Sequence, residues 1–205
     1  MSNIDELMAK LKLERKIENK NKEKENIEEP KEEEDKEAIL KRVTEEMNQG
    51  DVTLEGRKFK FVRKRFLDER IELLIPLGYF EERVNENNNL ILVNEGFGLS
   101  INFTYINQGA IKQSFDDFKA GMEKQFKNME FYLEWIESRE HGEGDSKISY
   151  GTYKTPTGKG DIYNAIIYRE KNGTSIIGNY NCFYKDLKIW EFLIKGTIMS
   201  MRILK

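Results

Sequence analysis

The sequence predicts an α+β fold, in which a largely antiparallel sheet packs against helices behind a charged N-terminal arm. Two observations lead to this prediction. All aromatic residues (12 Phe, 9 Tyr and 2 Trp) follow residue 58, so the apolar area for a core lies in the later part of the chain. In that part, segments with alternating apolar side chains surround one amphipathic segment and precede another. We therefore expect an arm over residues 1–50 and one α+β domain over residues 51–205.

Charge and cysteine content limit the classes of partner. Residues 1–50 carry eleven Lys and Arg against fifteen Asp and Glu, and the rest carry 23 against 22. Neither part has the concentrated positive charge that nucleic-acid phosphates require, so we expect no nucleic-acid partner. Cys182 is the only cysteine, which excludes an internal disulfide and favours a reducing compartment. With no signal-peptide pattern and no long apolar run, we expect a cytoplasmic protein without membrane insertion.

The arm combines dense charge with two short apolar stripes. Without aromatic residues it has little area to bury, so we expect it to be mostly disordered or transiently helical. Ser2 and Asp5 form a variant of the capping box before the first stripe, and a second stripe runs from Ala38 to Met47. The alternative is a docking arm whose first helix lies in a groove of a partner. The first stripe consists of Ile4, Leu7, Met8 and Leu11.

The first half of the domain is expected to form two pairs of strands. Lys58–Phe66 alternates between apolar and basic side chains, and Arg70–Ile75 follows it as a second strand. Pro76 ends this strand, because proline cannot continue a ladder. Leu90–Val93 and Leu99–Ile106 then predict a hairpin, since the second of these alternates between apolar and polar side chains from Leu99 to Tyr105.

The second half is expected to contain two helices and further strands. Ser114 is a good N-cap, and Asp116 and Asp117 follow it in the first turn, where the helix dipole favours anions. The pair Asn172-Gly173 predicts a tight hairpin, and a final helix is expected from Asp186. The buried stripe of the first helix is predicted to be Phe115, Phe118, Met122 and Phe126. The strands are predicted at Phe131–Arg139, Lys147–Tyr153, Asp161–Arg169 and Thr174–Phe183, with a short closing strand near Ile203.

No pattern in the sequence indicates a catalytic, cofactor or metal site. His141 is the only histidine and falls in a Gly-rich turn, while Cys182 falls in an apolar strand, so nothing supports a dyad of the two. One His and one Cys cannot build a zinc site. Gly151–Gly160 lacks the spacing of a phosphate-binding loop. The carboxylate pair Glu81 and Glu82 is expected in a solvated loop, and we expect no cofactor.

Three segments carry a resemblance to a known architecture. Leu67–Tyr79 places a turn before a strand that ends in proline, and Gly98–Phe103 is a strand ahead of the helix near Ser114. The chain closes with a helix containing Trp190 and the segment Ile198–Ile203. This order resembles the Mog1/PsbP-like α+β sandwich, and within it the bacterial DcrB-like branch that includes the Eag-type chaperones of secreted effectors. The resemblance covers residues 58–205 and implies a non-enzymatic binding domain, since members act as adaptors, assembly factors or chaperones.

We therefore expect a non-enzymatic protein-binding module, a cytosolic chaperone or adaptor for a client in a secretion or assembly system. Its client is expected on a sheet face that the helices leave uncovered; otherwise a helix covers that face and its residues are core. Two alternatives stay open: a structural subunit that docks through the arm, and an enzyme without a recognisable motif. A homodimer is also left open. The predicted partner-binding residues are Tyr153, Tyr163, Ile167 and Ile177.

Overall fold

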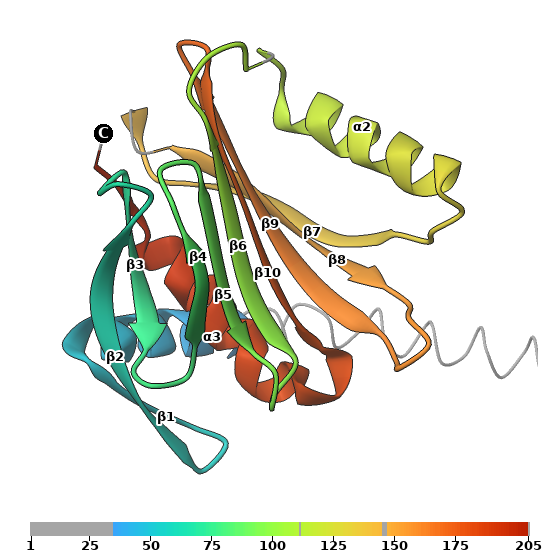
Figure 1. The fold of residues 1–205 in the computed structure, drawn as a ribbon. Coiled ribbons are helices and arrows are strands. Elements are labelled where there is room, and N and C mark those ends of the chain that lie inside the picture. Colours follow the sequence, from blue (N-terminus) through green and yellow to red (C-terminus); the bar gives the residue numbers. More distant parts are fainter. Residues whose placement is uncertain (1–34, 111, 145–146, 205) are drawn as a thin grey trace, which may run out of the picture. The chain divides into compact units, whose positions relative to one another are not determined.

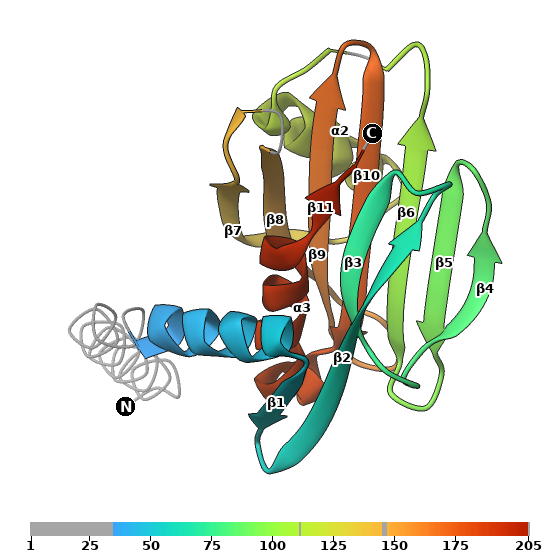
Figure 2. The same ribbon diagram turned by 90° about the vertical axis from the view of Figure 1, so that its left-hand side faces the viewer.

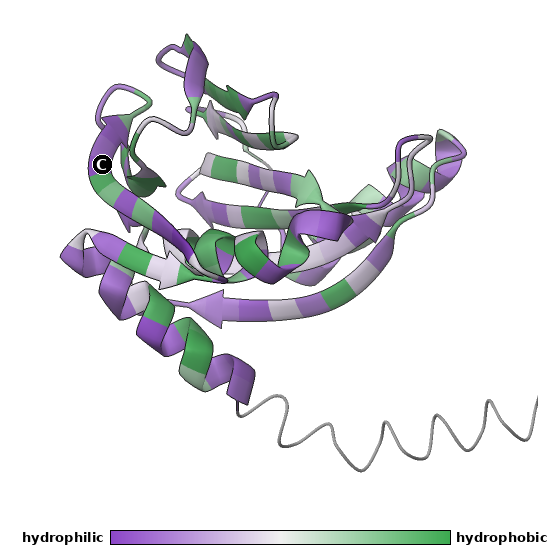
Figure 3. Ribbon diagram, turned by 90° about the horizontal axis from the view of Figure 1, so that it is seen from below, coloured by the Kyte–Doolittle hydropathy of each residue, from purple (hydrophilic) through white to green (hydrophobic). Residues whose placement is uncertain are grey.

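The computed structural model (Figure 1) confirms the predicted α+β class. It describes residues 35–110, 112–144 and 147–204. Over these residues the chain forms two sheets in which all paired strands are antiparallel, together with helices. Figure 3 shows the alternation behind the strand predictions, because hydrophilic and hydrophobic bands follow one another along the strands.

The chain divides into two compact units, Met1–Lys41 and Arg42–Lys205. Residues 35–41 are the described part of the first unit, and they are helical. The predicted docking stripe from Ile4 to Leu11 lies outside the described residues, and its role stays a prediction. The second unit contains both sheets, and it begins before the boundary that the sequence predicts at residue 50.

The smaller sheet has the strand order β1-β2-β3-β11. The predicted strands near residues 58–66 and 70–75 and the short closing strand are all present in it. Its strands are β1 (Asp51–Leu54), β2 (Arg57–Phe66), β3 (Ile71–Pro76) and β11 (Arg202–Ile203).

The larger sheet has the strand order β4-β5-β6-β10-β9-β8-β7. The predicted hairpin at Asn172-Gly173 is confirmed, and both residues have the positive φ (54° and 77°) that such a turn needs. Its strands are β4 (Glu81–Asn85), β5 (Asn89–Asn94), β6 (Leu99–Ile106), β7 (Glu134–His141), β8 (Ile148–Thr155), β9 (Ile162–Lys171) and β10 (Thr174–Phe183).

Two helices lie on opposite faces of the larger sheet (Figures 1 and 2). α3 (Leu187–Ser200), which a 3-10 turn η2 (Tyr184–Asp186) precedes, shares its face with the smaller sheet. Trp190 of α3 contacts the smaller sheet, because the centroid of its ring lies 5.7 Å from that of Phe59 in β2. α2 (Phe115–Asn128) lies on the other face, where the ring of Phe118 stacks on that of Tyr168 in β9 at 4.6 Å.

A helical segment before β1 also packs on α3. Residues 42–49 are helical, and Val43 and Met47 are fully buried. Met47 fits because position 196 on α3 is glycine: a Cβ there would lie 2.6 Å from Met47 Sδ. Asn48 Nδ2 donates a hydrogen bond to Ser200 Oγ over 3.0 Å. The second stripe, which the sequence places in the arm, therefore contributes two side chains to the core of the second unit.

The sequence does not predict two of the strands, β1 and β4. β1 has only four residues and pairs with β2 through a turn in which Glu55 and Gly56 both have positive φ. Glu81 and Glu82 lie in β4 rather than in a loop, which corrects the prediction. β4 is an edge strand that exposes most of its side chains, so no alternation between apolar and polar residues marks it.

Candidate functional site

The two reactive side chains that the sequence offers do not meet. Cys182 is buried in β10, and burial raises the pKa of its thiol to about 12. His141 lies at the end of β7, and its Nε2 lies 2.9 Å from the backbone carbonyl oxygen of Met199. β8 and β9 separate these two strands, so the residues lie more than about 14 Å apart at the usual strand spacing. The pair therefore cannot act as nucleophile and base.

The described residues contain neither a metal-binding cluster nor a membrane-spanning helix. No group of three or more His, Cys, Asp or Glu side chains among them is arranged to hold a metal ion. Of the helices in the described part of the chain, none has both the length and the apolar character needed to cross a membrane.

The four predicted partner-binding residues do not share one surface. Tyr163 and Ile167 are buried on the α3 face of the larger sheet. Tyr153 is buried on the opposite face beneath α2, where its ring lies 6.2 Å from that of Phe126. Ile177 is half-buried and pairs with Tyr168 in the register of β9 and β10. The sequence left open whether these large side chains lie in the core or on an exposed face. The burial of Tyr153, Tyr163 and Ile167 agrees with the core.

α2 begins as the sequence predicts. The Ser114 side chain accepts a hydrogen bond from the Asp117 backbone N–H over 3.0 Å. The Asp117 carboxylate in turn accepts one from the Ser114 backbone N–H over 3.3 Å, which completes a capping box. This cap fixes where the helix starts above the sheet.

α2 contacts the sheet mainly through aromatic rings and buries none of its residues fully, which corrects the predicted buried stripe. None of its fourteen residues, all within the described part of the chain, is buried, and the four stripe residues are only half-buried. Gly151 of β8 leaves room for this contact, because a Cβ there would lie 2.9 Å from the Trp135 ring and 3.3 Å from the Phe115 ring. The sequence shows that the helix is amphipathic, but it does not show how deeply the apolar side chains are buried against the sheet.

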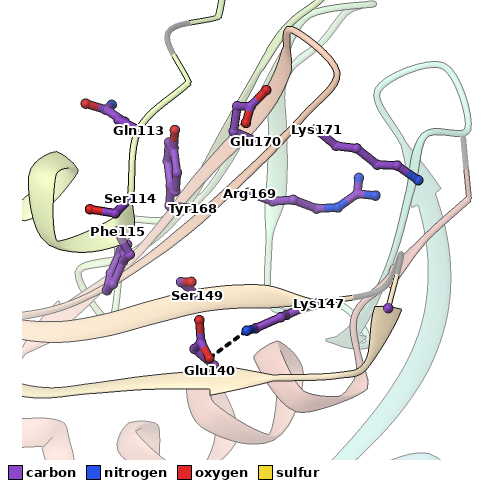
Figure 4. A pocket seen from close by; sticks show the side chains of 11 residues that line it. Gln113, Ser114, Phe115, Glu140, Lys147, Ser149, Tyr168, Arg169, Glu170 and Lys171 are labelled. Carbon is purple, nitrogen blue, oxygen red and sulfur yellow. Dashed lines mark ion pairs between the residues drawn. The ribbon is translucent and has the colours of Figure 1, made fainter.

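A polar pocket of about 430 Å³ lies at the start of α2 (Figure 4). Its lining brings Lys147, Arg169 and Lys171 beside Glu140 and Glu170. Lys147 Nζ lies 2.8 Å from a Glu140 carboxylate oxygen, and Glu170 accepts a hydrogen bond from the Gly173 backbone N–H over 3.0 Å. Both carboxylates thus have partners within the protein. The pocket can form polar contacts, and its described lining contains neither His nor Cys; the Ser114 hydroxyl in it donates to the Asp117 carboxylate over 2.7 Å as part of the helix cap.

An exposed apolar cluster lies at the other end of α2. Met129, Phe131, Tyr132 and Ile136 expose 55%, 63%, 61% and 49% of their surface, and we call these four residues the apolar corner. They are four of the seven large apolar side chains that are exposed over the described residues, and they fall within eight consecutive positions. Scattered exposed apolar residues are ordinary, whereas a cluster of this kind is typical of an interaction site.

Backbone hydrogen bonds hold the apolar corner in place. The Phe131 N–H donates to the Phe126 carbonyl oxygen over 2.8 Å, and the Glu130 N–H donates to that of Lys127 over 3.1 Å. Glu130 has a positive φ of 58°, which turns the chain sharply after the helix. The turn therefore presents the aromatic side chains outward instead of folding them beneath α2.

A groove of about 400 Å³ runs beside the apolar corner, and we call it the α2 groove. The edge-to-face contact of Phe126 and Phe131, with ring centroids 6.4 Å apart, lies within it. The sequence analysis missed this site, although one signal was available: three consecutive apolar residues cannot all face inward from a strand. The groove is lined by Glu123, Phe126, Lys127, Glu130, Phe131, Tyr132 and Leu133.

Comparison with solved structures supports the fold described above, whereas comparison by sequence finds no match. No protein-family model and no curated protein matches the sequence. The solution structure of the cyanobacterial PsbP protein CyanoP from Synechocystis sp. PCC 6803 is similar, with a TM-score of 0.55 and 10% identity over 70% of this chain and 92% of that chain. A protein of unknown function from Pseudomonas aeruginosa, PA94, has a TM-score of 0.46 and 12% identity over 71% of this chain and 97% of that chain. The predicted Mog1/PsbP-like fold is confirmed, and the assignment to the DcrB-like branch stays a prediction.

Proposed function

We propose that this chain is a non-enzymatic protein-binding module, a cytoplasmic chaperone or adaptor whose client docks on the apolar corner. The observation that carries the proposal is that four large exposed apolar side chains fall within eight consecutive positions, three of them directly after α2 and the fourth in β7. Exposed apolar residues grouped in this way mark partner sites more often than scattered ones do.

The chemistry of the corner suits a protein partner. Phe131 and Tyr132 are aromatic, and Met129 is flexible and polarizable. Tyr, Phe and Met are enriched in the cores of protein interfaces, where aromatic residues supply much of the binding energy. Fully burying one such side chain contributes at most about 1.5–3 kcal/mol, so these residues can supply part of the binding energy of a larger interface.

The rest of the described chain supports a binding role over catalysis. Cys182 is buried as a thiol, and His141 interacts with a backbone carbonyl. The carboxylates of the polar pocket are engaged by Lys147 and by the Gly173 backbone. The stripe Ile4, Leu7, Met8 and Leu11 remains a proposed second contact through the arm.

A pull-down from native lysate with matched variants tests the proposal. Phe131→Ser with Tyr132→Ser should remove a client that mass spectrometry identifies and that binds the purified wild-type chain directly. Leu77→Ser is the control, because Leu77 is a single exposed apolar residue, 56% exposed, outside the corner. A client that the double variant and the wild type recover equally well would contradict the proposal.

A further inference from the structure

We infer that the α2 groove takes a basic amphipathic helix, a partner segment whose apolar face is flanked by Lys or Arg. This inference rests on the proposed function and names the chemical class of the segment that docks. Two properties of the groove carry it: its place beside the last turns of α2 and the sign of the charge on the side chains that line it.

The groove lies beside the last turns of α2. Its lining includes positions 123, 126 and 127 of the helix, which have the spacing i, i+3 and i+4 of one helix face, and Glu130 from the turn that follows. The opposite wall is the segment 131–133 after the helix. A groove that runs alongside a helix accepts a second helix, whose side chains fit between the rows of the first. Phe126, half-buried against Tyr153, is an apolar contact for the incoming side chains.

The charge around the groove is negative. Glu123 and Glu130 line it against one cation, Lys127, and neither carboxylate has an ion-pair partner among the described residues. α2 also ends here, at Asn128, so the negative end of its dipole adds to the two carboxylates. Lys or Arg beside the apolar face of a partner would pair with these groups.

The same charges disfavour two other occupants. An anionic membrane surface would meet carboxylates and the negative end of a helix, and like charges repel. A second copy of the chain, docked through a two-fold axis, would place Glu123 and Glu130 of each copy near those of the other. A basic helix is the occupant that satisfies both the apolar and the charged part of the surface.

Two synthetic peptides test the inference with the full chain. Each is a helix of about five turns, roughly 18 residues, with the same Leu and Ala face, and the polar positions are all Lys in one and all Glu in the other. Fluorescence anisotropy should show that the Lys peptide binds at least about tenfold more tightly than the Glu peptide, and that high salt reduces the difference.

Three variants separate specific docking from general attraction. Phe131→Ser with Tyr132→Ser keeps the net charge and should weaken binding of the Lys peptide about tenfold or more. Glu123→Gln with Glu130→Gln should weaken it about threefold. Leu77→Ser should leave it unchanged. Circular dichroism verifies that each variant is folded, so that a loss of binding reports on the surface itself.

Other results would overturn the inference. These are equal binding of the two peptides, or binding of the Lys peptide that Phe131→Ser with Tyr132→Ser does not change. Binding to phosphatidylglycerol vesicles that depends on Phe131 would assign the groove to a membrane, and dimerisation that depends on Phe131 would assign it to a second copy. If a client is lost in the double variant but its docking segment is acidic, the proposed function stands and this inference fails. If neither a client nor the Lys peptide depends on Phe131, both fail.

Discussion

α2 and α3 have the same length of fourteen residues and lie on opposite faces of the larger sheet, yet they are packed very differently. α3 buries seven residues, including Trp190, Leu193 and Ile198, whereas α2, described in full, buries none. The smaller sheet and residues 42–49 pack on α3, whereas α2 packs on the sheet mainly through half-buried aromatic rings. The comparison indicates that the α3 face supplies stability and that the α2 face is available for binding.

The largest effect on stability is expected from removing the helical segment that packs on α3. Deleting residues 1–50 removes Val43 and Met47, two fully buried side chains, and should lower the free energy of unfolding by about 3–6 kcal/mol. Deleting residues 1–34 keeps both side chains and should lower the free energy of unfolding much less. Urea unfolding of the two truncated chains measures the difference. Equal losses would mean that residues 42–49 do not belong to the core.

A matched pair of substitutions compares the two helices directly. Leu193→Ala on α3 should lower the free energy of unfolding by about 2–5 kcal/mol, because it leaves a cavity in the core. Phe118→Ala on α2 removes a half-buried ring that stacks on Phe115 and Tyr168 and should lower the free energy of unfolding by about 1–2 kcal/mol. Chemical denaturation measures the free energy of unfolding of both variants. An equal loss at the two sites would contradict the difference in packing between α2 and α3.

The ion pairs of α3 predict a dependence on alkaline pH. Burial by itself lowers the pKa of Lys195, but Glu137 and Glu191, with carboxylate oxygens 2.6 and 2.7 Å from Nζ, more than offset this and raise it. The resulting stability is fully present below the unfolded pKa of about 10.4 and is lost as pH rises through the raised folded pKa. Unfolding curves at about pH 9 and about pH 11 should show this loss in the wild type, and Lys195→Met should reduce it.

The smallest effect on stability is expected at the apolar corner. Phe131→Ser with Tyr132→Ser should lower the free energy of unfolding by no more than about 1 kcal/mol, because both side chains are largely exposed and the ring contact of Phe131 with Phe126 is lost. Thermal unfolding monitored by circular dichroism measures this directly. A large destabilisation would show that the corner is structural and would remove the contrast with α3.

Local signals account for what the sequence predicts correctly. The alternation in Leu99–Ile106, the pair Asn172-Gly173 and the cap at Ser114 each specify structure within a few residues, and each is confirmed. β4 carries no such signal because it is an exposed edge strand. The lateral order of the strands, with β10 between β6 and β9, depends on pairing between distant segments and has no local signal.

The candidate site depends on tertiary packing, which is why the sequence analysis placed it elsewhere. Large side chains such as Tyr163 and Ile167 suggested an open face, but both are buried in the middle of the sheet. Phe131 and Tyr132 were expected to begin a strand, whereas β7 begins at Glu134 and leaves them in the turn after α2. The exposure of Phe131 and Tyr132 depends on where α2 ends relative to the sheet, which is a tertiary feature.

Site-specific photo-cross-linking in cells tests the central claim most directly. A photoreactive amino acid at Tyr132 samples the apolar corner, and the same residue at Gln113 samples the polar pocket at the other end of α2. We predict a discrete adduct with one client protein from position 132 and none from position 113. Absence of an adduct at position 132, or the same adduct at both positions, would contradict the assignment of the apolar corner as the docking surface.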